Sequence, residues 1–369
     1  MAALIAVGIV AALVAALAIV LLTRTLLNDR MLWPALGAAA ATALITIGLG
    51  TAFGIAPLVY LIGISAFALP VLVLMEAAAI ASGADTFGRW VLMLSWGVII
   101  FPLSALVPLW LTASCAGTDC ELEDFGGALP LLVSSSAFVL LAWLPAGVIE
   151  RAEPDPQSHR RAVLALLLFW TAFVIWLATL EGAIDEFTPR IALAAFVGPA
   201  SASVTWALAD RLRDVRRPIA RSLVFGLVAG IAATIPGAVA VSFPWSLAVG
   251  ALAGAVGAVS YSSRATGSAG LAARWGFVIL VATAVGYLAP AIAGDTVGIL
   301  FSAHLDVLSV PLLSFLGVGL FSLLVSAPTW VLLQRHASRD RVPAAIRSDT
   351  SDDADGVVNS TRPKDAEER

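Results

Sequence analysis

The chain is poor in charge, in lysine, in histidine and in cysteine. Only 12% of its 369 residues are charged, whereas a soluble globular protein carries about 25%. It has one lysine beside twenty arginines, three histidines and two cysteines. Such a low charge argues against a soluble globular chain. The net charge of -4 argues against a nucleic-acid partner, because no basic face is large enough to follow a phosphate backbone.

What the chain has instead is long apolar runs, with 60% hydrophobic residues and a mean hydropathy of +0.96. A helix needs about twenty apolar residues to cross a bilayer. The runs therefore predict an all-α polytopic membrane protein of about eleven transmembrane helices. The expected spans are residues 2–22, 33–53, 56–81, 88–112, 126–148, 161–180, 190–209, 219–241, 245–263, 273–293 and 309–334.

The basic residues predict how these spans are oriented. If the N-terminus is outside, 13 basic residues in loops and 7 in the tail, 20 of the 21 in all, fall on the inside, and only Arg190 is left outside. We therefore expect a multi-pass protein of the cell membrane with an extracellular N-terminus and a cytoplasmic C-terminus. Residues 1–337 form the expected transmembrane domain. Residues 338–369 are polar, lack apolar periodicity and are expected to be a disordered cytoplasmic tail.

Both cysteines lie in one loop that this topology puts outside. Cys115 and Cys120 are five residues apart in the sequence Ser-Cys-Ala-Gly-Thr-Asp-Cys. An oxidising exterior favours a disulfide between them, and two free thiols are the alternative. Two cysteines are too few for the usual zinc site with four thiolate or imidazole ligands.

Ionisable residues are almost absent from the expected spans. Glu76 is placed about one turn from the inner end of the third span, where it can reach the interface or cap a neighbouring helix. Because intramembrane charges usually mark proton relays or ion pathways, their scarcity predicts no buried ion pair and no pump. No nucleophile, metal cluster or cofactor site stands out, so we expect neither an enzyme nor a cofactor.

Paired glycines mark two of the later spans. Gly226 and Gly230, and likewise Gly250 and Gly254, are four residues apart, which lets a neighbouring backbone approach one helix face. The stretch Gly226-Leu-Val-Ala-Gly-Ile-Ala-Ala-Thr-Ile-Pro236 resembles the Gly-x-x-Ala-Gly-Leu-Val-x-x-Thr-Pro stretch of the ammonium transporter (Amt/Mep/Rh) family, with its threonine displaced by one position.

A second segment, Leu-Glu-Asp-Phe-Gly-Gly-Ala at 122–128, resembles the family's Leu-Asp-Phe-Ala-Gly-Gly. Alignment on Gly126 and Gly127 puts Glu123 at the family's structural aspartate, whereas alignment on the Asp-Phe pair selects Asp124. The resemblance implies the family's fold of eleven spans with the N-terminus outside. It also implies a homotrimer in the lipid bilayer.

The pore residues depart from the family pattern. The positions of the family's two pore histidines are occupied by Leu131 and Trp275, and the gate residues that follow Trp176 appear as Thr179 and Leu180. Leucine offers a solute no hydrogen bond and an indole offers one donor, so a small polar solute that sheds water here finds few partners.

Two hypotheses follow from the resemblance and from these departures. In the first, the chain conducts ammonia, ammonium or another small solute along a pathway lined by Leu131, Trp176, Thr179 and Trp275. Trp110 would then offer its ring to a cation at the outer mouth, worth about 0.5–2 kcal/mol, or would simply anchor the interface. In the second, the chain does not conduct and acts as a sensor or as a partner subunit of a true transporter.

Overall fold

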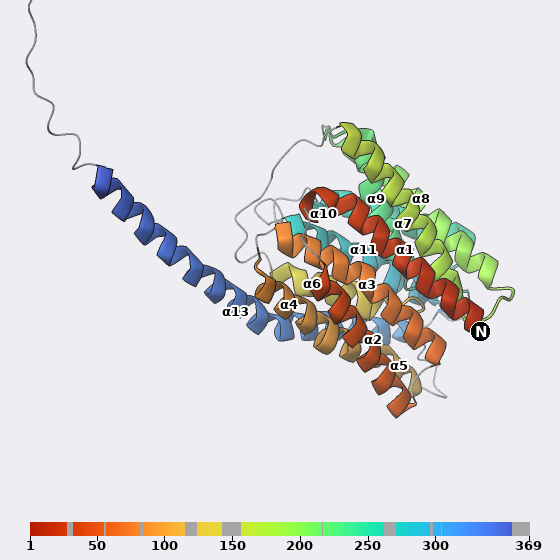
Figure 1. Cartoon of the computed structure of the whole chain (residues 1–369). Coiled ribbons are helices and arrows are strands. Elements are labelled where there is room, and N and C mark those ends of the chain that lie inside the picture. The colour runs from red at the N-terminus through yellow and green to blue at the C-terminus, as the bar shows by residue number, and fades with distance from the viewer. Residues whose placement is uncertain are drawn as a thin grey trace, which may run out of the picture.

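The structure is a computed structural model of the chain and is almost entirely helical (Figure 1). It describes residues 1–27, 32–54, 57–81, 84–114, 124–141, 156–215, 217–261, 271–295, 298–303 and 305–355. In chain order the helices are α1 (Ala2–Leu27), α2 (Trp33–Phe53), α3 (Leu58–Ala81), α4 (Thr86–Leu94), η1 (Ser95–Ile100), α5 (Phe101–Ser114), η2 (Leu129–Val133), α6 (Ser134–Leu140), α7 (Pro156–Thr179), α8 (Thr188–Leu212), α9 (Ile219–Thr234), α10 (Phe243–Tyr261), α11 (Leu271–Ala293), α12 (Ile299–Ser302), η5 (Asp306–Leu308) and α13 (Ser309–Asp355).

These helices confirm the all-α polytopic membrane fold. Within the described ranges, eight helical segments are long and apolar enough to cross a membrane, and three shorter apolar helices cover Leu129–Leu140, Val163–Thr179 and Ile219–Thr234. Each of these segments overlaps one of the expected spans. The fourth span is composite, because α4, η1 and α5 follow one another without a break.

The C-terminal ends of two helices, α9 and α13, differ from those of the expected spans. The eighth span was expected to reach residue 241, but α9 ends at Thr234, two residues before Pro236, which has no N–H to donate to a helical hydrogen bond. The last helix, α13, continues to Asp355, past the start of the expected tail at residue 338. The sequence has no glycine between Leu333 and Gly356 that would end it, and Figure 1 shows this part projecting from the bundle.

The paired glycines bring α9 and α10 against α8. A Cβ at Gly226 would lie 2.5 Å from the carbonyl oxygen of Ala202, and Gly230 is in equally close contact with the backbone of Pro199. Gly250 and Gly254, on α10, meet the same stretch of α8. The motif is therefore a packing device, as small residues four apart commonly are in membrane helices.

Short links make successive helices antiparallel, so the two ends of the bundle can be named. The link of residues 54–57, for example, joins α2 to α3. The N-terminal rim holds the starts of α1, α3 and η2. The opposite rim holds the starts of α2, α4 and α11.

Candidate functional site

Leu131 lies in the main buried cluster of the bundle. It belongs to the π-helical turn η2 and is 0% exposed. The same buried cluster contains several aromatic residues: Phe67, Trp96, Phe101, Phe138, Phe173 and Trp176. At the position that the family pattern assigns to a pore histidine, the structure therefore has a fully enclosed aliphatic side chain.

Trp176 and Thr179 lie on α7, and their polar atoms are already bonded. The Trp176 indole stacks on Phe67 with ring centroids 3.9 Å apart and planes 19° apart. Its Nε1–H donates to the carbonyl oxygen of Gly63 at 3.0 Å. The Thr179 hydroxyl donates to the carbonyl oxygen of Trp176 at 2.7 Å. Neither donor is left for a solute.

Two π-helical segments, η1 and η2, are joined beside Leu131. Trp96, on η1, donates a hydrogen bond from Nε1 to the hydroxyl of Ser134 at 3.0 Å, and Ser134 directly follows η2. Such π turns are frequent at functional sites, and the sequence reasoning did not predict them. Pro102 and Pro130 could have indicated these π turns from the sequence, because proline has no N–H to donate to the usual helical hydrogen bond.

Trp275 is in a different place from Leu131. Its ring packs against Phe225 at 4.7 Å, Tyr261 at 5.5 Å and Trp206 at 6.4 Å between centroids. The guanidinium of Arg217 lies 4.9 Å from the Phe225 ring and 5.0 Å from the Tyr261 ring. We call these four rings the aromatic cluster. It contains residues of α8, α9, α10 and α11, and it is separate from the buried cluster that holds Leu131.

Asp124 anchors the start of η2 at the N-terminal rim. Its carboxylate oxygens accept from the backbone N–H groups of Ala128, at 2.5 Å, and Leu129, at 3.0 Å, and its carbonyl oxygen accepts from the Tyr60 hydroxyl at 3.0 Å. Gly127, with φ of +68°, makes the turn that brings these groups together. A carboxylate in this position satisfies N–H groups that have no partner in the helix.

Burial raises the pKa of the Asp124 carboxyl from 3.8 to about 7, against the lowering effect of the two backbone hydrogen bonds. Asp124 precedes the spanning segment. Glu123, the alternative structural acid, lies outside the described residues, as do Cys115 and Cys120. Trp110 is part of α5, but its side chain is likewise outside the description.

This pKa predicts a pH-dependent stability. Because the pKa of Asp124 is higher in the folded chain than in the unfolded one, its contribution is full below pH 3.8 and is lost as the pH rises through about 7. We expect the melting temperature of the wild type to fall relative to that of Asp124→Asn over this interval. Thermal unfolding of both proteins across the pH range measures the difference, and parallel curves would contradict it.

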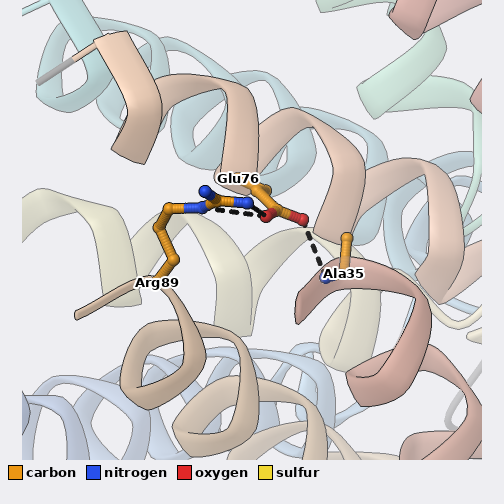
Figure 2. Close-up of polar contacts among 3 residues, drawn as sticks. All are labelled: Ala35, Glu76 and Arg89. Atoms are coloured by element: carbon orange, nitrogen blue, oxygen red, sulfur yellow. Dashed lines mark hydrogen bonds and ion pairs between the residues drawn. The ribbon is translucent and has the colours of Figure 1, made fainter. Parts of the chain in front are cut away.

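Glu76 and Arg89 form a buried ion pair within the spans of α3 and α4 (Figure 2). Glu76 is 0% exposed and Arg89 is 6% exposed. The Arg89 Nε donates to Glu76 Oε1 at 3.0 Å, and Glu76 Oε2 accepts from the backbone N–H of Ala35, at the start of α2, at 2.7 Å. The expectation of no buried ion pair was therefore wrong, while the capping role expected for Glu76 is what the structure has.

The pair was missed because Arg89 was counted as a loop residue that orients the chain. The structure instead turns it inward at the beginning of α4, where Asp85 caps the helix by accepting from the N–H of Gly88 at 2.9 Å. Among the residues described, no three His, Cys, Asp or Glu side chains converge into a group that could hold a metal ion.

No family model and no curated protein sequence matches the chain. Solved structures do. Mep2 of Saccharomyces cerevisiae matches with a TM-score of 0.69 and 15% identity over 90% of this chain and 87% of that one. The delta442 mutant of Mep2 from Candida albicans matches with a TM-score of 0.71 and 17% identity over 90% and 91%. A protein named Sensor Amt Protein matches with a TM-score of 0.66 and 15% identity over 90% and 94%.

The fold resemblance inferred from the glycine motifs and from the Asp124 segment is thereby confirmed. The match extends over about nine-tenths of the chain although only 15–17% of residues are identical. The chain has the fold of the Amt/Mep ammonium transporters, with the buried Leu131 where the family pattern has a pore histidine.

Proposed function

We propose that this protein recognises a small solute without conducting ammonium ions, and that it acts as a sensor or as a partner subunit of a true transporter. The observation that carries the proposal is Leu131, which is 0% exposed within the main buried cluster. A charge at the middle of a bilayer costs at least about 2.5–3.5 kcal/mol. Leucine offers it no hydrogen bond in return.

The neighbouring residues support the same conclusion. The rings of Phe67 and Trp176 stack within the same buried cluster as Leu131. The donors of Trp176 and Thr179 are bonded to backbone carbonyl groups. Trp275, the second position where the family has a pore histidine, packs into the aromatic cluster instead. An ion entering the bundle would therefore replace its hydration shell with apolar contacts. One structural neighbour is named a sensor, which is consistent with a fold used for detection.

A second candidate function is conduction of ammonia or another small neutral solute. It is favoured by buried hydroxyl groups, on Thr46, Ser65 and Ser104, that have no hydrogen-bond partner among the described residues. A small polar molecule could bond to such groups. In this case Trp110 would recruit a cation at the outer mouth through its ring face.

Flux into proteoliposomes separates the two functions. With methylammonium as the solute, we expect uptake by reconstituted protein to equal that of empty liposomes, while a known ammonium transporter in the same lipids serves as the positive control. Uptake well above that of empty liposomes would reject the non-conducting function. A Trp110→Ala variant would then test the outer site, since unchanged uptake would remove its role.

We further propose that the protein lies in the cell membrane with its N-terminus outside, because, leaving aside the buried Arg89, 19 of the other 20 basic residues then fall inside. A homotrimer is the assembly that the fold implies. An apolar groove of about 440 Å³ between α1 and α7, lined by Val7, Val10 and Leu168 among others, is a surface that a neighbouring copy would cover. Native mass spectrometry in a mild detergent tests the trimer.

A further inference from the structure

A densely basic segment links α8 to α9. Residues 210–221 contain five arginines against two aspartates, a net charge of +3. The segment begins in the last turn of α8 and ends in the first turn of α9. Because successive helices are antiparallel, it lies at the rim that also holds the starts of α2, α4 and α11, which the proposed orientation puts on the cytoplasmic side. Its charge therefore lies just beyond the apolar part of two helices.

One of these arginines is held inward by a buried carboxylate. Asp210 is 3% exposed, and its Oδ2 accepts from the Arg217 guanidinium at 2.7 Å and from the Ser222 hydroxyl at 2.7 Å. The Arg217 guanidinium also faces the Phe225 and Tyr261 rings of the aromatic cluster. Since Asp210 belongs to α8 and Ser222 to α9, these contacts tie the two ends of the segment together and restrict its conformation.

Around this anchor the segment has a positive surface. Its other charged residues that the structure describes are exposed: Arg211, Arg213, Asp214 and Arg221. The Arg221 guanidinium lies 5.6 Å from the Phe225 ring, the same ring that Arg217 faces. Arg213 donates from Nη1 to the carbonyl oxygen of Ala258, on α10, at 3.1 Å. Three exposed arginines against one exposed aspartate therefore lie on a link that the buried carboxylate holds in place.

Large apolar side chains are exposed beside these charges. Leu208 is 54% exposed, Leu212, the last residue of α8, is 77% exposed, and Ile219, the first residue of α9, is 53% exposed. Both helices are apolar, so their ends at this rim lie where acyl chains meet headgroups. A soluble acidic protein would bind the arginines but would leave these side chains in water. A phospholipid supplies a phosphate for the arginines and acyl chains for the apolar side chains.

We infer that the exposed arginines of residues 210–221 bind the headgroup of an anionic phospholipid, whose acyl chains lie along Leu212 and Ile219. A guanidinium donates paired hydrogen bonds to phosphate oxygens. Clusters of about four to eight basic residues directly beyond a spanning helix attract anionic lipids. Asp210 and Arg217 hold the segment in place and do not bind the lipid. The inference goes beyond the proposed function and is independent of whether the chain conducts a solute.

Native mass spectrometry of the purified full chain tests the site, with phosphatidylglycerol as the probe and phosphatidylcholine of the same acyl chains as the reference. Both lipids have a phosphate, but only phosphatidylglycerol has a net negative charge. We expect the wild type to bind phosphatidylglycerol more tightly than phosphatidylcholine. In the double variant Arg211→Gln with Arg221→Gln, the affinity for phosphatidylglycerol should fall about fivefold for each arginine removed. Its affinity for phosphatidylcholine should be unchanged, which also shows that the variant is folded.

Arg161→Gln is the matched control. Arg161 is an exposed arginine near the start of α7, outside the segment, so this variant should keep the affinity of the wild type for phosphatidylglycerol. Equal affinity of the wild type for the two lipids would overturn the inference, as would an unchanged affinity in the double variant. An equal loss in Arg161→Gln would show that only the overall charge matters. Soluble polyglutamate that binds the wild type as tightly as phosphatidylglycerol would instead assign the surface to an acidic protein.

Discussion

Replacing Glu76 by alanine is expected to destabilise the folded chain by about 3–5 kcal/mol. The carboxylate is the buried partner of Arg89 and also accepts from the N–H of Ala35. Without it, a guanidinium that is only 6% exposed loses its counter-charge inside the membrane-spanning segments. The start of α2 loses its acceptor as well. Unfolding in detergent, followed by circular dichroism, measures the loss.

Three further variants separate the two roles of Glu76. Glu76→Gln keeps an oxygen for Ala35 but removes the charge, so it should recover only part of the stability. Glu76→Ala combined with Arg89→Leu removes both charges, and it should be more stable than Glu76→Ala alone because no uncompensated charge remains. Glu186→Ala, on an exposed loop, should change stability by less than about 0.5 kcal/mol. A double variant no better than the single one would show that the charge is not the cause.

The helices could be predicted from the sequence because each span is a local property. About twenty apolar residues between breaks decide a membrane helix without reference to its neighbours, and the eleven apolar helical segments overlap the expected spans. The glycine motifs were similarly readable. Gly226 and Gly230 are four residues apart, and they pack closely against the backbone of α8, as small residues at this spacing commonly do.

The direction of individual side chains could not be predicted in the same way. A family pattern counted along the sequence assigns Trp275 to the pore because it precedes a glycine. In the helix that one-residue step is a rotation of about 100°, and Gly276 occupies the face that meets α6. Leu131, by contrast, was assigned by counting from Gly126 and Gly127 at the start of its own span, and it does belong to the buried cluster.

Pairing between spans was equally inaccessible. Glu76 and Arg89 are thirteen residues apart on two helices, and their contact depends on the rotation of each helix about its axis. In the sequence Arg89 reads as an inside loop residue that helps to orient the chain. The π-helical turns η1 and η2 add a further shift of register that no apolar periodicity records.

Replacing Gly286 by alanine is expected to prevent the native packing of α11 on α9. A Cβ at this position would overlap the carbonyl group of Ala233, which is backbone on the facing helix and cannot rotate away. Overpacking of a core ordinarily costs about 1–3 kcal/mol, and a clash between two backbones should reach or exceed the upper end of this range. The yield of folded monodisperse protein and its melting temperature both report the loss.

The chain supplies matched controls for this prediction. Gly48 on α2 and Gly317 on α13 are also helical glycines, but a Cβ at either position would have no atom within 4 Å. Alanine there should stabilise the helix by about 0.5–1 kcal/mol, because glycine loses more backbone entropy on folding. If Gly286→Ala behaved like these two variants, α9 and α11 would have to be further apart than the structure places them. A loss confined to Gly286 would instead identify close backbone packing, rather than side-chain chemistry, as what holds this part of the bundle together.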